Sequence, residues 1–206
     1  MSYNKFHSMS IVITGNPGVG KHTIAKEIAK NLEYSIIDIN QIAKDMDLFE
    51  ENQDTNDVDT EKLKKNLNNE NLTGSVIVGH LAPYVLDKHQ VKIMVILRRS
   101  PYDLITTYKE RKYTDKKSKE NTGSEILGII THEALSKFQE KAIQVNTSGK
   151  SIEGVVKKIT SIISDNIEGD KVDWLDLVVK NNDLKKFFVD WLNNALKFVK
   201  ILVWNF

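Results

Sequence analysis

A glycine-rich loop that directly follows a short apolar strand constrains this chain more than any other feature. Residues 10–14 read SIVIT, a β-branched run typical of a strand buried in a parallel sheet, and residues 15–23 read GNPGVGKHT. Gly15, Gly18 and Gly20 let the backbone turn tightly and direct its N–H groups inward. Because the helix expected next adds the positive end of its dipole, the loop predicts a site for phosphate groups.

The end of this loop carries the side chains expected to bind ATP. Lys21 supplies a positive charge for the β- and γ-phosphates. The strict motif has Ser or Thr directly after the lysine, where the hydroxyl helps to hold magnesium, but this chain has His22 and places Thr23 next. We therefore assign the Mg²⁺-binding hydroxyl to Thr23. The expected ATP-binding residues of the loop are Gly15, Gly18, Gly20, Lys21, His22 and Thr23.

Apolar runs alternate with helical patterns along most of the chain. Ile24, Ile28 and Leu32 have helical spacing, which predicts a helix over about residues 21–31. Further strands are expected at residues 35–39, 75–79, 92–97 and 141–146. Strands that alternate with helices in this way predict an α/β domain with five parallel strands and right-handed crossovers.

Two charged insertions interrupt this alternation. Residues 45–71 are acidic at first and then helical in pattern, which predicts a small helical flap, although a charged run is also typical of a plain solvated face. Residues 108–120 (YKERKYTDKKSKE) are dense in cations and predict a second, exposed flap.

The C-terminal part of the chain has a pattern of its own. After a helix expected at residues 151–166, the run Glu168-Gly169-Asp170 indicates a boundary, so we expect a P-loop domain at 1–167 and a helical extension at 168–206. The extension predicts two helices. Its last residues, 198–206, are apolar on nearly all sides, so they are expected to pack on their own domain, on a partner or on a second copy.

Composition excludes several classes of protein. The absence of cysteine rules out disulfides and thiolate zinc sites. The sequence has neither a run of roughly 20 apolar residues nor a secretory signal pattern, so we expect a cytoplasmic protein without membrane contact. A net charge of +1 argues against nonspecific wrapping of nucleic acid, which leaves only a local basic patch to touch RNA phosphates. No sequence-specific nucleic-acid binding is predicted.

Several motifs together narrow the class of phosphate-binding protein. They are GNPGVGKHT, GHLAPYVL, VILRRSP, ERKYTDKKSKEN and EILGIITHEAL, in that order. Over about residues 10–175 the chain resembles the archaeal putative adenylate kinases and their eukaryotic counterpart, adenylate kinase isoenzyme six. The resemblance implies a P-loop NTPase three-layer sandwich with a five-stranded parallel sheet, an NMP-binding insertion, a lid insertion and a C-terminal helical extension.

The same resemblance implies a dual function. Members combine broad-specificity nucleoside monophosphate kinase activity (ATP + AMP to 2 ADP) and ATPase activity with a role in maturing the small ribosomal subunit, where they bind a ribosomal protein. Carried over to this sequence, the resemblance places the NMP-binding segment at 38–61 and the lid at 110–120. In the lid, Arg111 would contact ATP and Lys119 would assist. The implied catalytic residues are Lys21, Arg111 and His80.

The chain departs from this family near the expected magnesium site. Family members have an Asp-x-His pattern at the end of the third strand, whereas this chain reads Val78-Gly79-His80. Asn40-Gln41 replaces an acid after the second strand, where Asp38 is the nearest substitute. We therefore predict ATP binding with slow kinase turnover. For His80 two roles are open: it orients the attacking water or contacts a phosphate, or it only caps the end of a strand.

These departures leave two further functions open. One is an ATP-dependent assembly factor or nucleotide switch, which tolerates slow turnover. The other is a related P-loop kinase whose phosphate acceptor is a different nucleotide or a small metabolite.

Overall fold

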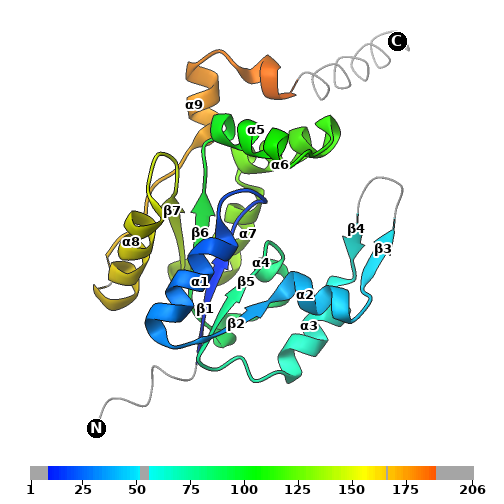
Figure 1. Ribbon diagram of the computed structural model, residues 1–206, viewed down its shortest axis with the longest axis vertical. Coiled ribbons are helices and arrows are strands. Elements are labelled where there is room, and N and C mark those ends of the chain that lie inside the picture. Colours follow the sequence, from blue (N-terminus) through cyan, green and yellow to red (C-terminus); the bar gives the residue numbers. More distant parts are fainter. Residues whose placement is uncertain (1–8, 52–55, 166, 189–206) are drawn as a thin grey trace, which may run out of the picture. The chain divides into compact units, whose positions relative to one another are not determined.

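The computed structural model describes residues 9–51, 56–165 and 167–188 (Figure 1). These residues form two compact units, and each is described by itself. The first unit comprises the chain up to Arg99 together with Ile129–Val172, and the second comprises Ser100–Gly128 together with the chain from Asp173 onward.

A five-stranded parallel sheet forms the centre of the first unit. Its strands in spatial order are β2 (Ser35–Asp38), β5 (Ser75–Val78), β1 (Ser10–Thr14), β6 (Val91–Arg98) and β7 (Ala142–Asn146). Counted along the chain, the order of these five strands is 2-3-1-4-5, the order of P-loop kinases. Every residue of the central strand β1 is buried, as a strand covered on both faces requires. The predicted fold class and all five predicted strands are confirmed.

Helices cover both faces of this sheet (Figure 1). One face carries α1 (Lys21–Leu32) and α8 (Ile152–Asp165), and the other carries α4 (Ala82–Val85) and α7 (Ile129–Phe138). The 3-10 turns η1 (Lys88–Gln90) and η2 (Gln139–Lys141) precede β6 and β7. Since side chains alternate along a strand, Val12 packs into the α4 and α7 layer while its buried neighbours Ile11 and Ile13 point to the opposite face.

The acidic insertion differs from the helical flap that its sequence predicts. Helix α2 (Ile39–Asp45) is followed by a short antiparallel hairpin of β3 (Phe49–Glu51) and β4 (Asn56–Val58), and only then by α3 (Thr60–Asn69). Asp47 has a left-handed φ of 52°, which ends α2, and the dense negative charge that follows in the sequence disfavours continuation of the helix. The second half of the insertion is helical as predicted.

A short segment after α8, which contains Gly169 and Asp170, packs along β7 in the first unit. The N–H of Asp170 donates to the carbonyl oxygen of Gln144 at 2.8 Å, and the Asp170 carboxylate accepts from the N–H of Asn146 at 2.8 Å and pairs with Lys158. Burial raises the pKa of Asp170, but these hydrogen bonds and the nearby lysines outweigh it, so the pKa lies below its ordinary value. A side chain at Gly169 would collide with Ile143. The predicted boundary segment is therefore fixed to the edge strand β7.

The second unit is a small helical assembly. It contains α5 (Pro101–Glu110), α6 (Asp115–Leu127) and α9 (Trp174–Lys180). The indole Nε1 of Trp174 donates to Oε1 of the buried Glu125 at 3.0 Å, and the Tyr102 and Phe187 rings meet edge to face at 5.4 Å. The region of the predicted exposed flap is thus mostly helical, and Tyr108 at its start is fully buried rather than exposed.

The C-terminal extension is described only in part. Helix α9 is the first of its two predicted helices, and residues 184–188 begin another. The apolar residues 198–206 and their docking lie outside the described residues. Within the described ranges, no helix has the length and apolar character needed to cross a bilayer.

Candidate active site

The glycine-rich loop lies where β1 ends and α1 begins, and two close constraints fix its shape. Gly15 has a φ of 133°, and a Cβ there would lie 2.4 Å from the carbonyl oxygen of Leu97, so only glycine fits. Gly20 has a φ of 96° and caps α1 without a side chain. Among the described residues, no side-chain cap hydrogen bond forms at the start of α1, and a helix start of this kind is suited to binding an anion.

Lys21 is buried inside this loop, with 6% of its surface exposed. Its Nζ donates to the carbonyl oxygen of Asn16 at 2.8 Å. A buried ammonium held by the loop's own backbone is placed to exchange that carbonyl for phosphate oxygens.

Two residues that sequence reasoning did not assign brace the loop from neighbouring strands. Arg99, after β6, donates from Nη1 to the carbonyl oxygen of Gly18 at 3.1 Å. Thr147, after β7, donates from Oγ1 to the carbonyl oxygen of Val19 at 3.4 Å. Both follow the carboxyl ends of parallel strands, where ligands bind in open α/β sheets. That position along the chain is the signal that would have found them.

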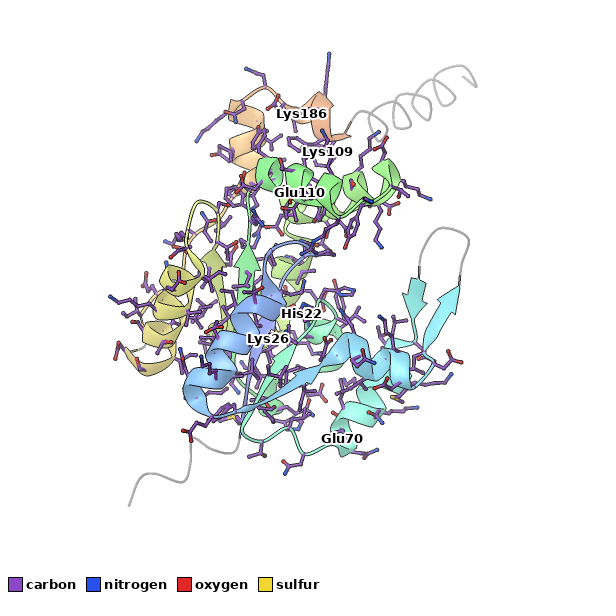
Figure 2. All side chains as sticks on the ribbon, in the orientation of Figure 1. His22, Lys26, Glu70, Lys109, Glu110 and Lys186 are labelled. Carbon is purple, nitrogen blue, oxygen red and sulfur yellow. The ribbon has the colours of Figure 1, made fainter. Side chains whose placement is uncertain are left out.

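His22, the residue that replaces the usual hydroxyl, contacts Asp38. Its Nε2 lies 2.9 Å from Oδ2 of Asp38. The other carboxylate oxygen, Oδ1, accepts from the backbone N–H groups of Asn40 and Gln41 at 2.9 and 3.3 Å and so caps α2. Figure 2 labels His22 at the first turn of α1 and Lys26 one turn further along.

Asp38 lies beside the position where the family pattern has an acid. In the parallel ladder, Asp38 at the end of β2 pairs in register with Val78 at the end of β5. Neighbouring strands are about 4.8 Å apart, so the Asp38 carboxylate projects one strand away from the apolar Val78. This register explains how Asp38 can stand near the expected metal position although the sequence pattern there lacks an acid.

Thr23 faces away from this carboxylate. Its side chain lines a groove of about 540 Å³ between α1 and α8, together with Ile152 and Val156. Successive helical residues project about 100° apart, and here His22 contacts Asp38 while Thr23 faces α8. The role of Thr23 in holding Mg²⁺ stays a prediction.

The described residues around His22 offer too few ligands to hold a divalent cation alone, so the cation would have to arrive bound to the nucleotide phosphates. Within residues 9–51, 56–165 and 167–188, no three His, Asp or Glu side chains cluster in a way suited to a metal ion. Magnesium in nucleotide sites is commonly held by one or two carboxylates, with phosphates and waters completing its shell. Asp38 is the carboxylate present, and the buried Oδ1 of Asn40, which has no hydrogen-bond partner among the described residues, is a further oxygen nearby in the chain.

His80, at the end of β5, is a neutral imidazole. Burial, the largest cause, and the charge of Lys21 together lower its pKa from 6.5 to about 4, although Asp38 acts in the opposite direction. The charges of Lys21 and Asp38 therefore lie near enough to His80 to act on its ring. A neutral ring can both donate and accept a hydrogen bond, which suits contact with a water or a phosphate oxygen.

The predicted lid residues belong to the second unit. Arg111 ends α5 and is exposed, and Lys119 is exposed on α6. Their contacts with ATP stay predictions. The predicted NMP-binding segment, 38–61, spans α2, the hairpin of β3 and β4, and the start of α3 in the first unit.

The sheet order and the loop define a P-loop kinase fold, and comparisons with known proteins agree. Residues 11–128 match the family model of an AAA domain. Over 189 residues the chain is 31% identical to a "Putative adenylate kinase" of Methanosarcina barkeri, covering 82% of this chain and 100% of the relative. Proteins of the same name from Saccharolobus solfataricus and Thermococcus kodakarensis are 30% and 31% identical and cover 73% and 75% of this chain, which spans 81% and 85% of their lengths. The chain belongs to this adenylate kinase family.

Solved structures support the fold alone. A shikimate kinase from Acinetobacter baumannii, in complex with shikimate, superposes with a TM-score of 0.52 at 19% identity and covers 78% of this chain and 96% of its own. The shikimate kinase of Bacteroides thetaiotaomicron gives a TM-score of 0.50 at 19% identity, covering 76% and 98%. The match therefore covers nearly the full length of both shikimate kinases.

Proposed function

We propose that this chain is a nucleoside monophosphate kinase that transfers the γ-phosphoryl group of ATP to AMP, with hydrolysis of ATP as a second activity. The observation that carries the proposal is Lys21, which is buried at the start of α1 with its Nζ bonded to the backbone of the glycine-rich loop. Membership of the adenylate kinase family supports AMP as the acceptor.

The side chains of the site position phosphates and neutralise charge rather than react covalently. Lys21 would leave Asn16 and bind phosphate oxygens as negative charge shifts during transfer. His80, neutral at physiological pH, would hydrogen-bond a transferring oxygen or a water without adding charge. Mg²⁺ arriving with ATP would neutralise the phosphates. Thr23 is proposed to hold it as the motif predicts, or Asp38 acts on it from the His22 side of α1, because the two side chains face different neighbours.

The test is whether ADP formation depends on AMP. Purified protein with ATP and Mg²⁺ is assayed for ADP with and without AMP, and the products are separated chromatographically. The kinase proposal expects ADP to form at two molecules per AMP consumed. ADP that forms at the same rate without AMP would contradict it and leave an ATPase. Replacing AMP by other nucleoside monophosphates or small hydroxyl metabolites in the same assay identifies the acceptor.

The second candidate function is an ATP-dependent switch that assists assembly of the small ribosomal subunit. Val78, which cannot accept a hydrogen bond from a metal-bound water, favours slow turnover, and a binding switch tolerates this. The partner proposed from the family resemblance is a small-subunit ribosomal protein, and the proposed location is the cytoplasm. AMP-independent ADP formation that changes when this ribosomal protein is added would support the switch.

A further inference from the structure

His22 occupies the position from which a P-loop normally offers a hydroxyl to the nucleotide cation. An imidazole there changes the chemistry of the donor from oxygen to nitrogen. The other hydroxyl of the motif, on Thr23, lines the groove between α1 and α8. The side chain of the loop that lies beside Asp38 and has a lone pair to offer a cation is therefore the imidazole of His22.

The contact with Asp38 decides which nitrogen of His22 is available. An ionised carboxylate only accepts hydrogen bonds, so the Nε2 that lies 2.9 Å from Oδ2 of Asp38 carries the proton. In the neutral ring, Nδ1 then carries the lone pair. Asp38 is itself held by the two N–H groups at the start of α2, so the ring is anchored by a carboxylate that cannot easily swing away.

This arrangement has the form of a carboxylate–histidine–metal unit. Histidine ligands in metal sites donate their second ring N–H to a carboxylate, which fixes the tautomer and makes the other nitrogen more basic. Nδ1 is also the ring nitrogen nearer to the backbone, so its reach from α1 is close to that of the hydroxyl it replaces. Imidazole suits first-row transition cations, whereas magnesium prefers oxygen.

We propose that Nδ1 of His22 is a direct ligand of the divalent cation bound with the nucleotide. The site therefore prefers a transition-metal cation that readily takes nitrogen ligands, such as Mn²⁺, to Mg²⁺. The inference rests on the proposed nucleotide binding. It assigns to this chain a cation class that its P-loop motif alone would not indicate.

The experiment uses the full chain and the non-hydrolysable analogue AMP-PNP. Calorimetry gives its affinity with Mn²⁺ and with Mg²⁺, and pulsed EPR of the Mn²⁺ complex detects coupling to an imidazole ¹⁴N. We expect about tenfold tighter binding with Mn²⁺, a factor in the range that disturbing a histidine ligand costs. In H22S, which restores a hydroxyl, the preference should fall to about twofold and the nitrogen coupling should disappear.

Two controls make the result specific. His80 is the other imidazole at this edge, so H80N must retain the coupling, and H89S, at an exposed histidine before β6, must retain both the coupling and the preference. Equal affinity with the two cations, or no imidazole coupling in the wild-type complex, overturns the inference while leaving nucleotide binding intact. Absence of AMP-PNP binding with either cation overturns the proposed function as well. The wild-type spectrum decides the matter even if H22S fails to fold.

Discussion

The Nζ of Lys21 lies 2.8 Å from the carbonyl oxygen of Asn16, so the loop lysine is bonded to the backbone of its own loop. We expect K21M to reduce ATP affinity by about 100-fold or more, because it removes the buried ammonium that would bind phosphate in place of this carbonyl. Fluorescent ATP-analogue titration measures the loss. The matched control is K26M, which replaces an exposed lysine on the same helix and should leave ATP affinity unchanged (Figure 2). Equal losses in both variants would contradict a specific role for Lys21.

Gly15 and Gly74 provide a matched pair for testing the loop's close contact. Both have positive φ, but a Cβ at Gly15 would lie 2.4 Å from the Leu97 carbonyl oxygen, whereas a Cβ at Gly74 meets nothing within 4 Å. We expect G74A to lower the free energy of unfolding by about 1 kcal/mol from backbone strain alone. G15A should cost about 3 kcal/mol, because the collision adds to the strain. Urea denaturation of the two variants measures the difference, and equal costs would show that the loop relaxes.

Buried His80 predicts a pH dependence of stability. Its folded pKa of about 4 lies below the ordinary 6.5, so the unfolded chain binds more protons between these values and stability rises with pH across that window. On acidification from pH 6.5 to 4, His80 should cost up to about 3 kcal/mol of unfolding free energy. Because carboxylates also titrate in this range, the measurement is the difference between wild type and H80N in urea denaturation at each pH. Parallel curves for the two proteins would refute the assignment.

The hydrogen bond from Trp174 to Glu125 predicts coupling between α9 and α6. Glu125 is 1% exposed, so E125A leaves the indole N–H without its acceptor and should destabilise the second unit by about 1–3 kcal/mol. W174F should cost a similar amount, and the double variant less than the sum, with a coupling energy of about 1 kcal/mol. Hydrogen exchange of the α6 amides measures these changes. E120A, at an exposed position on the same helix, should leave the exchange unchanged, and strict additivity of the first two variants would rule out the coupling.

The five strands could be predicted because each is an apolar run bounded by turn residues, and Ser10–Thr14 has the same limits in sequence and structure. The β3 and β4 hairpin could not, since its three-residue strands lie in a charged segment without apolar alternation. The parallel arrangement of the five strands followed from the alternation of elements. The strand order and the register that places Asp38 beside Val78 depend on how distant strands such as β2 and β5 pair.

The loop residues of the site were identifiable because the motif is local. The contact between His22 and Asp38 was not, since it joins α1 to the start of α2 through folding of the sheet. The braces from Arg99 and Thr147 come from still more distant strands. Burial of Glu125 was hidden for a related reason, because its partner Trp174 comes from a segment that follows α8 in the chain.

The division of the second unit between two stretches of sequence has a consequence for the order in which the protein matures during synthesis. Helices α5 and α6 leave the ribosome before β7 and α8, but Trp174 and Phe187, which pack in the same unit, follow only afterward. At roughly 5–20 residues per second, the nascent chain passes through a stage of seconds in which these helices lack those partners. A chain released just before Trp174 would carry every strand of the sheet and the whole phosphate loop, yet it would expose the Tyr102 and Glu125 surfaces to chaperones and proteases.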